Sequence, residues 1–126
     1  MEARKKIIQQ ARPDIVISIH ANKFPSSERR GAQVFFDEYN NAGKLLADSI
    51  QSNVNLLNKE FVKRDFDALA GDYFLLKCSK APSVIMECGF LSNPEDEILL
   101  TDNEYCKRLA FCIYGGIVGY LETETR

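Results

Sequence analysis

The sequence predicts an α/β fold, in which a parallel or mostly parallel sheet is covered by helices on both faces. Three short segments rich in β-branched and apolar residues, at 15–20, 32–37 and 83–88, are typical of strands. Amphipathic segments typical of helices alternate with them, and this alternation indicates a parallel sheet. The length of 126 residues suits one domain.

The first third of the chain predicts one helix and two strands. Residues 2–11 form a short amphipathic pattern that Pro13 ends, because proline has no N–H to continue a helix. The almost continuously apolar run at 15–20 predicts a strand buried on both faces. A polar loop at 23–30 follows, and Gly31 opens the next strand.

The middle of the chain predicts a long helix, an irregular segment and a third strand. The helix spans 40–58, and its apolar residues fall within one arc of the helical wheel. They are Ala42, Leu45, Leu46, Ile50, Val54 and Leu57. Residues 59–71 read as irregular, and 73–77 as either a strand or a helical turn. The third strand, at 83–88, ends at Gly89.

Two helices are predicted to close the chain. Asn93 with Pro94 and the acids after it is typical of an N-cap followed by a helical first turn. Residues 101–104, Thr-Asp-Asn-Glu, match the capping box. The stripe that follows is Tyr105, Leu109, Cys112, Ile113, Gly116, Ile117 and Tyr120.

Composition excludes several classes of protein. Hydrophobic residues make up 45% of the chain and charged residues 27%, which is typical of a soluble globular protein. Lys and Arg number 16 and Asp and Glu 18, so the formal net charge of −2 argues against a nucleic-acid partner. No apolar run approaches the roughly 20 residues of a membrane span, and residues 1–14 lack the apolar core of an export signal.

The cysteines and the single histidine limit metal chemistry. The four cysteines, Cys78, Cys88, Cys106 and Cys112, show no C-x-x-C spacing, so we expect buried free thiols rather than a disulfide or a structural zinc site. His20 is the one histidine, whereas a catalytic zinc normally takes three protein ligands. A self-contained zinc enzyme is therefore not expected.

His20 and Glu87 are the two residues that do not suit a core. Each lies at the carboxyl end of a predicted strand, the edge where open α/β sheets bind ligands. Burial would raise the pKa of Glu87, as a general base near neutral pH requires. Alternatively, Glu87 caps a loop or pairs with Lys77 or Arg64. A cysteine hydrolase that uses Cys88 with His20 is disfavoured, because neighbouring strand residues point to opposite faces.

Three segments resemble the amidase_3 family of zinc-dependent N-acetylmuramoyl-L-alanine amidases. They are 14–22 (DIVISIHAN), 31–36 (GAQVFF) and 82–96 (PSVIMECGFLSNPED), and they are most similar to the spore-cortex-modifying branch. The resemblance implies hydrolysis of the amide between N-acetylmuramic acid and the L-alanine of the stem peptide in peptidoglycan, outside the cytoplasmic membrane. It also implies that His20 is a zinc ligand, Glu87 the catalytic base and Asn22 a substrate-binding residue.

The chain departs from this family at its start. The family's D-P-G-H-G-G motif, which carries the first zinc-ligating histidine, is absent. We therefore expect residues 1–126 to be a single, N-terminally truncated amidase catalytic domain without the family's first strand or strands. The sheet edge left open would invite self-association, and neither tight zinc binding nor family-like hydrolysis is expected of this chain alone. Two alternatives remain: a catalytically silent remnant that binds wall fragments or a partner chain, and an unrelated soluble α/β protein.

Overall fold

A computed structural model describes residues 1–124. The described residues form four α-helices, four strands and one 3₁₀ helix, η1. In chain order these are α1 (Glu2–Ala11), β1 (Val16–Asn22), β2 (Gln33–Phe36), α2 (Asn41–Phe61), β3 (Leu69–Ala70), η1 (Phe74–Lys77), β4 (Ser83–Phe90), α3 (Pro94–Leu100) and α4 (Asn103–Glu124). None of the described helices is both long enough and apolar enough to cross a membrane.

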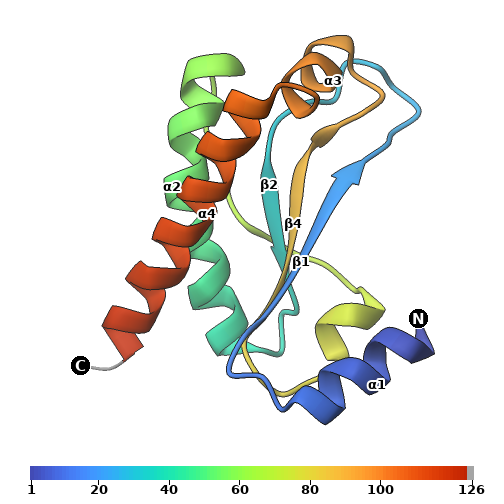
Figure 1. The fold of residues 1–126 in the computed structure, drawn as a ribbon, viewed down its shortest axis with the longest axis vertical. Helices are drawn as coiled ribbons and strands as arrows, with labels where there is room; N and C mark the ends of the chain where they lie inside the picture. Colours follow the sequence, from blue (N-terminus) through green and yellow to red (C-terminus); the bar gives the residue numbers. More distant parts are fainter. Residues whose placement is uncertain (125–126) are drawn as a thin grey trace.

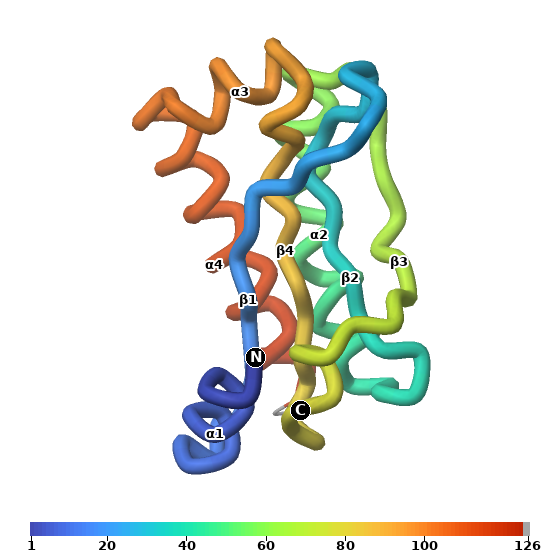
Figure 2. Tube along the Cα trace, turned by 90° about the vertical axis from the view of Figure 1, so that its right-hand side faces the viewer, coloured from blue at the N-terminus to red at the C-terminus, as the bar shows by residue number. Residues whose placement is uncertain are grey.

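The strands form one sheet in the order β1-β4-β2-β3. β1 runs parallel to β4, and β3 parallel to β2, whereas β2 is antiparallel to β4. The long helices α2 and α4 cover one face, while α1 and η1 lie on the other side, towards the end of the sheet where β1 begins (Figures 1 and 2). The predicted α/β class is confirmed, with a mostly parallel sheet flanked by helices.

The core lies between the sheet and the α2–α4 pair. Alternate residues of the central strands, among them Val34 of β2 and Met86 of β4, are fully buried against these helices. The two helices approach closely at Gly116, where an added Cβ would lie 2.5 Å from the Ile50 Cα. The stripe predicted on α4 is confirmed, because its members are buried or half-buried.

β1 is less buried than its sequence predicts. The prediction of a strand buried on both faces is wrong: no residue of β1 is fully buried, and Ile19 is 63% exposed. β1 is an edge strand, so its outer side has no neighbour among the described residues. Its apolar composition alone does not reveal this position.

Several local predictions also differ from the structure. The 101–104 capping box is wrong, since the Glu104 N–H donates to Asp102 Oδ1 and the Thr101 hydroxyl donates back to carbonyls of α3. Leu45 is 53% exposed rather than part of the core. All four cysteines are free as expected, but Cys106 is exposed. The cap of α3 is confirmed, with Asn93 Oδ1 accepting from the Asp96 N–H at 3.0 Å.

Candidate functional site

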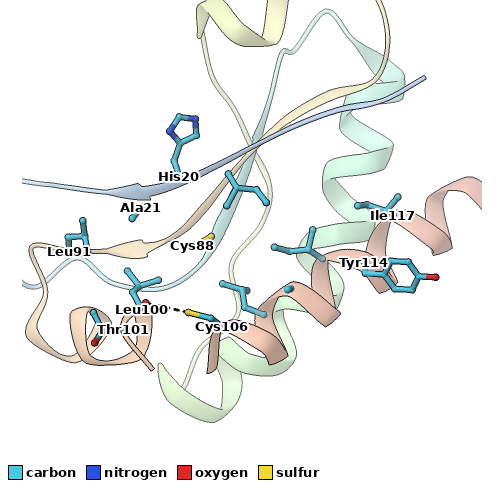
Figure 3. A pocket seen from close by; sticks show the side chains of 13 residues that line it. His20, Ala21, Cys88, Leu91, Leu100, Thr101, Cys106, Tyr114 and Ile117 are labelled. Atoms are coloured by element: carbon cyan, nitrogen blue, oxygen red, sulfur yellow. Dashed lines mark hydrogen bonds between the residues drawn. The ribbon is translucent and has the colours of Figure 1, made fainter. Parts of the chain in front are cut away.

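The sheet places His20 and Glu87 side by side. They are register partners in the parallel pair β1–β4, near the carboxyl ends of both strands. Because side chains alternate along a strand, both project to the face opposite the α2–α4 core. His20 also lines the apolar pocket on the α4 side, but Figure 3 shows its imidazole directed away from the α4 residues of that pocket. The predicted meeting of these two residues is confirmed.

Glu87 is a half-buried carboxylate that interacts electrostatically with His20. Its Oε2 is buried and makes no hydrogen bond to any described residue. Burial raises the pKa of Glu87 above its ordinary value, against a smaller lowering by His20. The alternative partners are engaged elsewhere: Lys77 pairs with Asp72, and Arg64 lies over the Phe66 ring. Glu87 is therefore not held in a salt bridge with either of them.

His20 makes one hydrogen bond. Its Nε2 lies 2.6 Å from the Ser18 hydroxyl, two residues earlier on the same face of β1. No described group bonds Nδ1. The imidazole thus keeps one nitrogen available for a further contact.

A cavity of about 160 Å³ opens over these two residues. Glu87 and Ile85 of β4 line it from the sheet, and His20 from the edge strand. The segment at η1 contributes the remaining wall, with Tyr73, Phe74 and Leu75, and α1 adds Arg4. A carboxylate with a free oxygen here can accept a proton from a bound water or substrate.

Gln33 is a neighbour that sequence reasoning missed. It pairs with Glu87 across the antiparallel β2–β4 ladder, so His20, Glu87 and Gln33 form one row over three strands. Its side-chain amide donates to the Asp67 carbonyl at 2.8 Å. The one sequence signal for Gln33 is that it is a polar residue inside an otherwise apolar strand. Its position next to Glu87 depends on the strand register, which the sequence does not show.

Asp96 was also missed, apart from its place in the first turn of a helix. Its carboxylate is 3% exposed and accepts backbone N–H groups from Gly31 at 2.9 Å and Phe90 at 3.0 Å. Arg30 Nε donates to the other oxygen at 3.1 Å. Asp96 therefore ties the start of β2 to the end of β4, just beyond the Gln33–Glu87 pair.

Asn22 lies beyond an irregularity in the β1–β4 register. Its Oδ1 accepts the Lys23 N–H at 2.8 Å, and its carbonyl accepts the Leu91 N–H. It is not among the residues that line the cavity at Glu87. Asn22 lies on β1 two residues after His20, opposite Phe90 of β4.

Cys88 lies on the face opposite Glu87. It lines an apolar pocket of about 510 Å³ between the β1–β4 end and α4, and His20 is also among the residues that line this pocket (Figure 3). Burial raises the pKa of its thiol to about 11. A thiol that stays protonated does not act as a nucleophile, so the structure gives no support to a Cys88–His20 hydrolase.

The described residues do not complete a metal site. No three His, Cys, Asp or Glu side chains within 1–124 lie where they could hold one ion. His20 and Glu87 supply one imidazole and one unpaired carboxylate, fewer ligands than the three that a catalytic zinc takes. Any zinc at this position needs ligands from outside these residues.

Comparison with known proteins gives consistent results. The family model described as N-acetylmuramoyl-L-alanine amidase, Amidase_3, matches residues 1–118. The chain is similar to the germination-specific N-acetylmuramoyl-L-alanine amidase of Bacillus subtilis, with 32% identity over 124 residues, 95% of this chain and 50% of that protein. It is also similar to the LytC amidase of B. subtilis, with 31% identity over 95% of this chain and 24% of that protein.

A solved structure shares the fold. The CwlD amidase of Clostridioides difficile, determined in complex with the GerS lipoprotein, superimposes with a TM-score of 0.87 at 36% identity. The match covers 97% of this chain and 61% of that one. This chain spans half or less of the length of the two curated relatives. Because the family model matches nearly the whole chain, the chain belongs to the Amidase_3 family of N-acetylmuramoyl-L-alanine amidases.

Proposed function

We propose that this chain carries the general base and one metal ligand of a peptidoglycan amidase. The bond cleaved is the amide between N-acetylmuramic acid and the L-alanine of the stem peptide. The observation that carries the proposal is the Glu87 carboxylate, half-buried, unbonded at Oε2 and beside His20 over a cavity. Membership of the Amidase_3 family supports the choice of substrate.

Glu87 is the proposed general base. Burial raises its pKa towards neutrality, which brings a carboxylate closer to the strength that a general base needs. Its free oxygen accepts a proton from water as the water oxygen bonds to the amide carbon. The same proton passes to the leaving nitrogen as the carbon–nitrogen bond breaks, so that one group serves as base and then as acid.

His20 is the proposed zinc ligand. A bound zinc ion would supply Lewis acidity at the amide carbonyl. The remaining ligands come from outside residues 1–124, because these residues supply too few. We therefore propose that the chain alone neither binds zinc tightly nor hydrolyses peptidoglycan at a family-like rate. Asn22 is proposed as a substrate-side residue on the family motif alone.

The site of action is proposed to be the cell wall or the spore cortex, outside the cytoplasmic membrane. The support comes from relatives named as germination-specific and cell wall amidases. Cortex and vegetative-wall peptidoglycan are therefore both substrates to be tested.

A chimera tests the proposal. The matching half of the B. subtilis germination-specific amidase is replaced by this chain, and stem-peptide release from purified wall and cortex is measured. Glu87→Gln should lower the rate by about 10²–10⁴-fold with zinc content unchanged, because only the proton acceptor is lost. His20→Ala should lower the zinc content as well.

Two controls make this test specific. Cys88→Ser, on the opposite face of the sheet, should retain most of the rate. Calorimetric titration of the unmodified chain with zinc should show no stoichiometric binding at micromolar affinity. A Glu87→Gln chimera that keeps more than about a tenth of the rate would contradict the role of Glu87.

A second candidate is a catalytically silent protein that binds wall fragments or a partner chain. It is favoured by the open edge of β1 and by the incomplete ligand set. An inactive chimera with normal zinc content, together with binding of muramoyl peptides by the unmodified chain, would support this candidate over the first.

A further inference from the structure

Two aromatic side chains border the cavity that contains Glu87. Tyr73 is 44% exposed and Phe74 is 40% exposed, and both line that cavity. They are consecutive residues at the start of η1, where the extended backbone of Tyr73 caps the 3₁₀ turn. Aromatic side chains that line a cavity together with a few polar groups are typical of ligand-binding sites.

The orientation of the Tyr73 ring is fixed by packing contacts. It packs edge-on against Phe35, with ring centroids 5.7 Å apart and an interplanar angle of 73°. Phe35 belongs to β2 and pairs with Ile85, one row below Glu87 on the same face. The ring also covers the Gly71 backbone, where any added Cβ would overlap it. A ring fixed in this way binds a ligand with little loss of conformational entropy.

The position of the rings determines what lies against them. Tyr73 and Phe74 line the same cavity of about 160 Å³ as Glu87 and His20. A substrate amide that reaches the Glu87 carboxylate through this cavity places the groups attached to that amide next to the two rings.

A pyranose ring suits this surface better than the stem peptide does. It has C–H groups on its faces and hydroxyl groups around its edge. An aromatic ring such as that of tyrosine offers an apolar face together with a polar handle. The alanine next to the cleaved bond has only a methyl group to offer such a surface.

We propose that Tyr73 and Phe74 form a sugar-binding surface that receives the muramic acid ring of the substrate. This inference rests on the proposed function, because it assumes that Glu87 acts on the amide next to that sugar. Tyr73 and Phe74 are then specificity residues that distinguish a glycan-linked peptide from a free peptide.

Binding to the chain itself tests this inference, without any need for catalysis. The ¹⁵N-labelled chain is titrated by NMR with N-acetylmuramic acid, with N-acetylmuramoyl-L-alanyl-D-isoglutamine, and with the same dipeptide lacking the sugar. Tyr73→Ala should weaken binding of both sugar-containing probes by roughly three- to tenfold. The affinity for the free dipeptide should stay the same, and Tyr73→Phe should behave like the unmodified chain.

Matched variants separate the sugar surface from general effects. Tyr114→Ala removes a more exposed tyrosine on α4, on the other side of the sheet, and should change nothing. Gly71→Ala should imitate Tyr73→Ala by displacing the ring. If Tyr73→Ala does not fold, Phe74→Leu provides the same comparison.

The outcomes distinguish the two proposals. Binding of the sugar probes with equal affinity to the unmodified chain and to the folded variants would overturn the sugar surface and leave the amidase proposal standing. If neither sugar probe perturbs the amides around Tyr73 and Glu87, the sugar surface is overturned, whereas the amidase proposal is decided separately by the Glu87→Gln chimera. Weakened binding of the sugar probes alone is the expected result.

Discussion

At the scale of single residues, Glu87 is a charged side chain within an otherwise apolar strand. It lies between Met86, which is fully buried in the core, and Cys88, which faces α4. Strand alternation directs its side chain to the open face, where only part of its charge is solvated. Burial raises its pKa because the charged form loses water without gaining a hydrogen bond at Oε2.

Glu87→Gln should therefore stabilise the folded chain at neutral pH. A carboxyl whose pKa is higher in the folded state favours folding while it is protonated. That contribution is complete below the unfolded value of 4.5 and is lost as the pH rises through the folded pKa. Glutamine has no such loss, so the variant should gain stability over the unmodified chain as pH rises above about 4.5.

Urea unfolding from pH 3.5 to 8 measures this difference. Glu38→Gln, at an exposed position, serves as control and should show no comparable trend. A constant difference between the Glu87 variant and the unmodified chain over the whole range would mean that burial does not perturb this carboxyl.

At the scale of elements, the end of β4 depends on a side chain outside the sheet. The Asp96 carboxylate binds backbone N–H groups of both Gly31 and Phe90, and Arg30 adds an ion pair. These bonds continue the β2–β4 connection beyond Gln33, where the ladder itself stops. Gly31, with φ of 108°, adopts a backbone conformation that favours glycine at this junction.

Asp96→Ala should destabilise the fold by about 2–4 kcal/mol, because it leaves two buried N–H groups and a nearly buried guanidinium without an acceptor. Thermal or urea unfolding measures the effect. Glu95→Ala provides the matched control: Glu95 pairs with the same Arg30, but its side chain is 73% exposed. Exposed pairs contribute about 0–1 kcal/mol, so equal losses in the two variants would contradict the buried role of Asp96.

The elements themselves follow from local sequence more closely than their connections do. The Asn93 cap, most of α2 and the stripe on α4 follow from side-chain chemistry and from periodicity of 3.6 residues. The predicted end of the helix at 58 and the irregular segment at 59–71 are wrong in part, because α2 continues to Phe61 and Leu69–Ala70 form β3. The sequence predicts Thr101 as the N-cap of α4, whereas in the structure Asp102 precedes the helix and accepts the Glu104 N–H. Both residues are good caps, and only tertiary contacts select between them. Periodicity could not decide between strand and turn at 73–77, which forms η1.

At the scale of the whole molecule, the sheet is open at one edge. β1 pairs only with β4 among the described strands, and its Ile19 is 63% exposed. An edge with free N–H and C=O groups and an apolar side chain is a template for another strand. We propose that a second copy, or another chain, pairs there.

Sedimentation velocity at increasing protein concentration tests that proposal. We expect concentration-dependent self-association, and Ile19→Lys should weaken it by about tenfold, equivalent to ~1.4 kcal/mol. Ile98→Lys, at a similarly exposed position on α3, should leave it unchanged. A chain that stays monomeric at all concentrations would contradict self-pairing at this edge.

The sequence by itself determined the local structure and the identity of the two candidate site residues. Periodicity, caps and β-branched runs depend on neighbours within a few positions, and His20 and Glu87 stand out because polar groups at strand ends are costly to bury. Only the tertiary structure decided that β1 lies at an edge, that β2 runs antiparallel, and that Gln33, Tyr73 and Asp96 surround or support Glu87. These features depend on register and on contacts between distant segments, which residue composition and spacing do not encode.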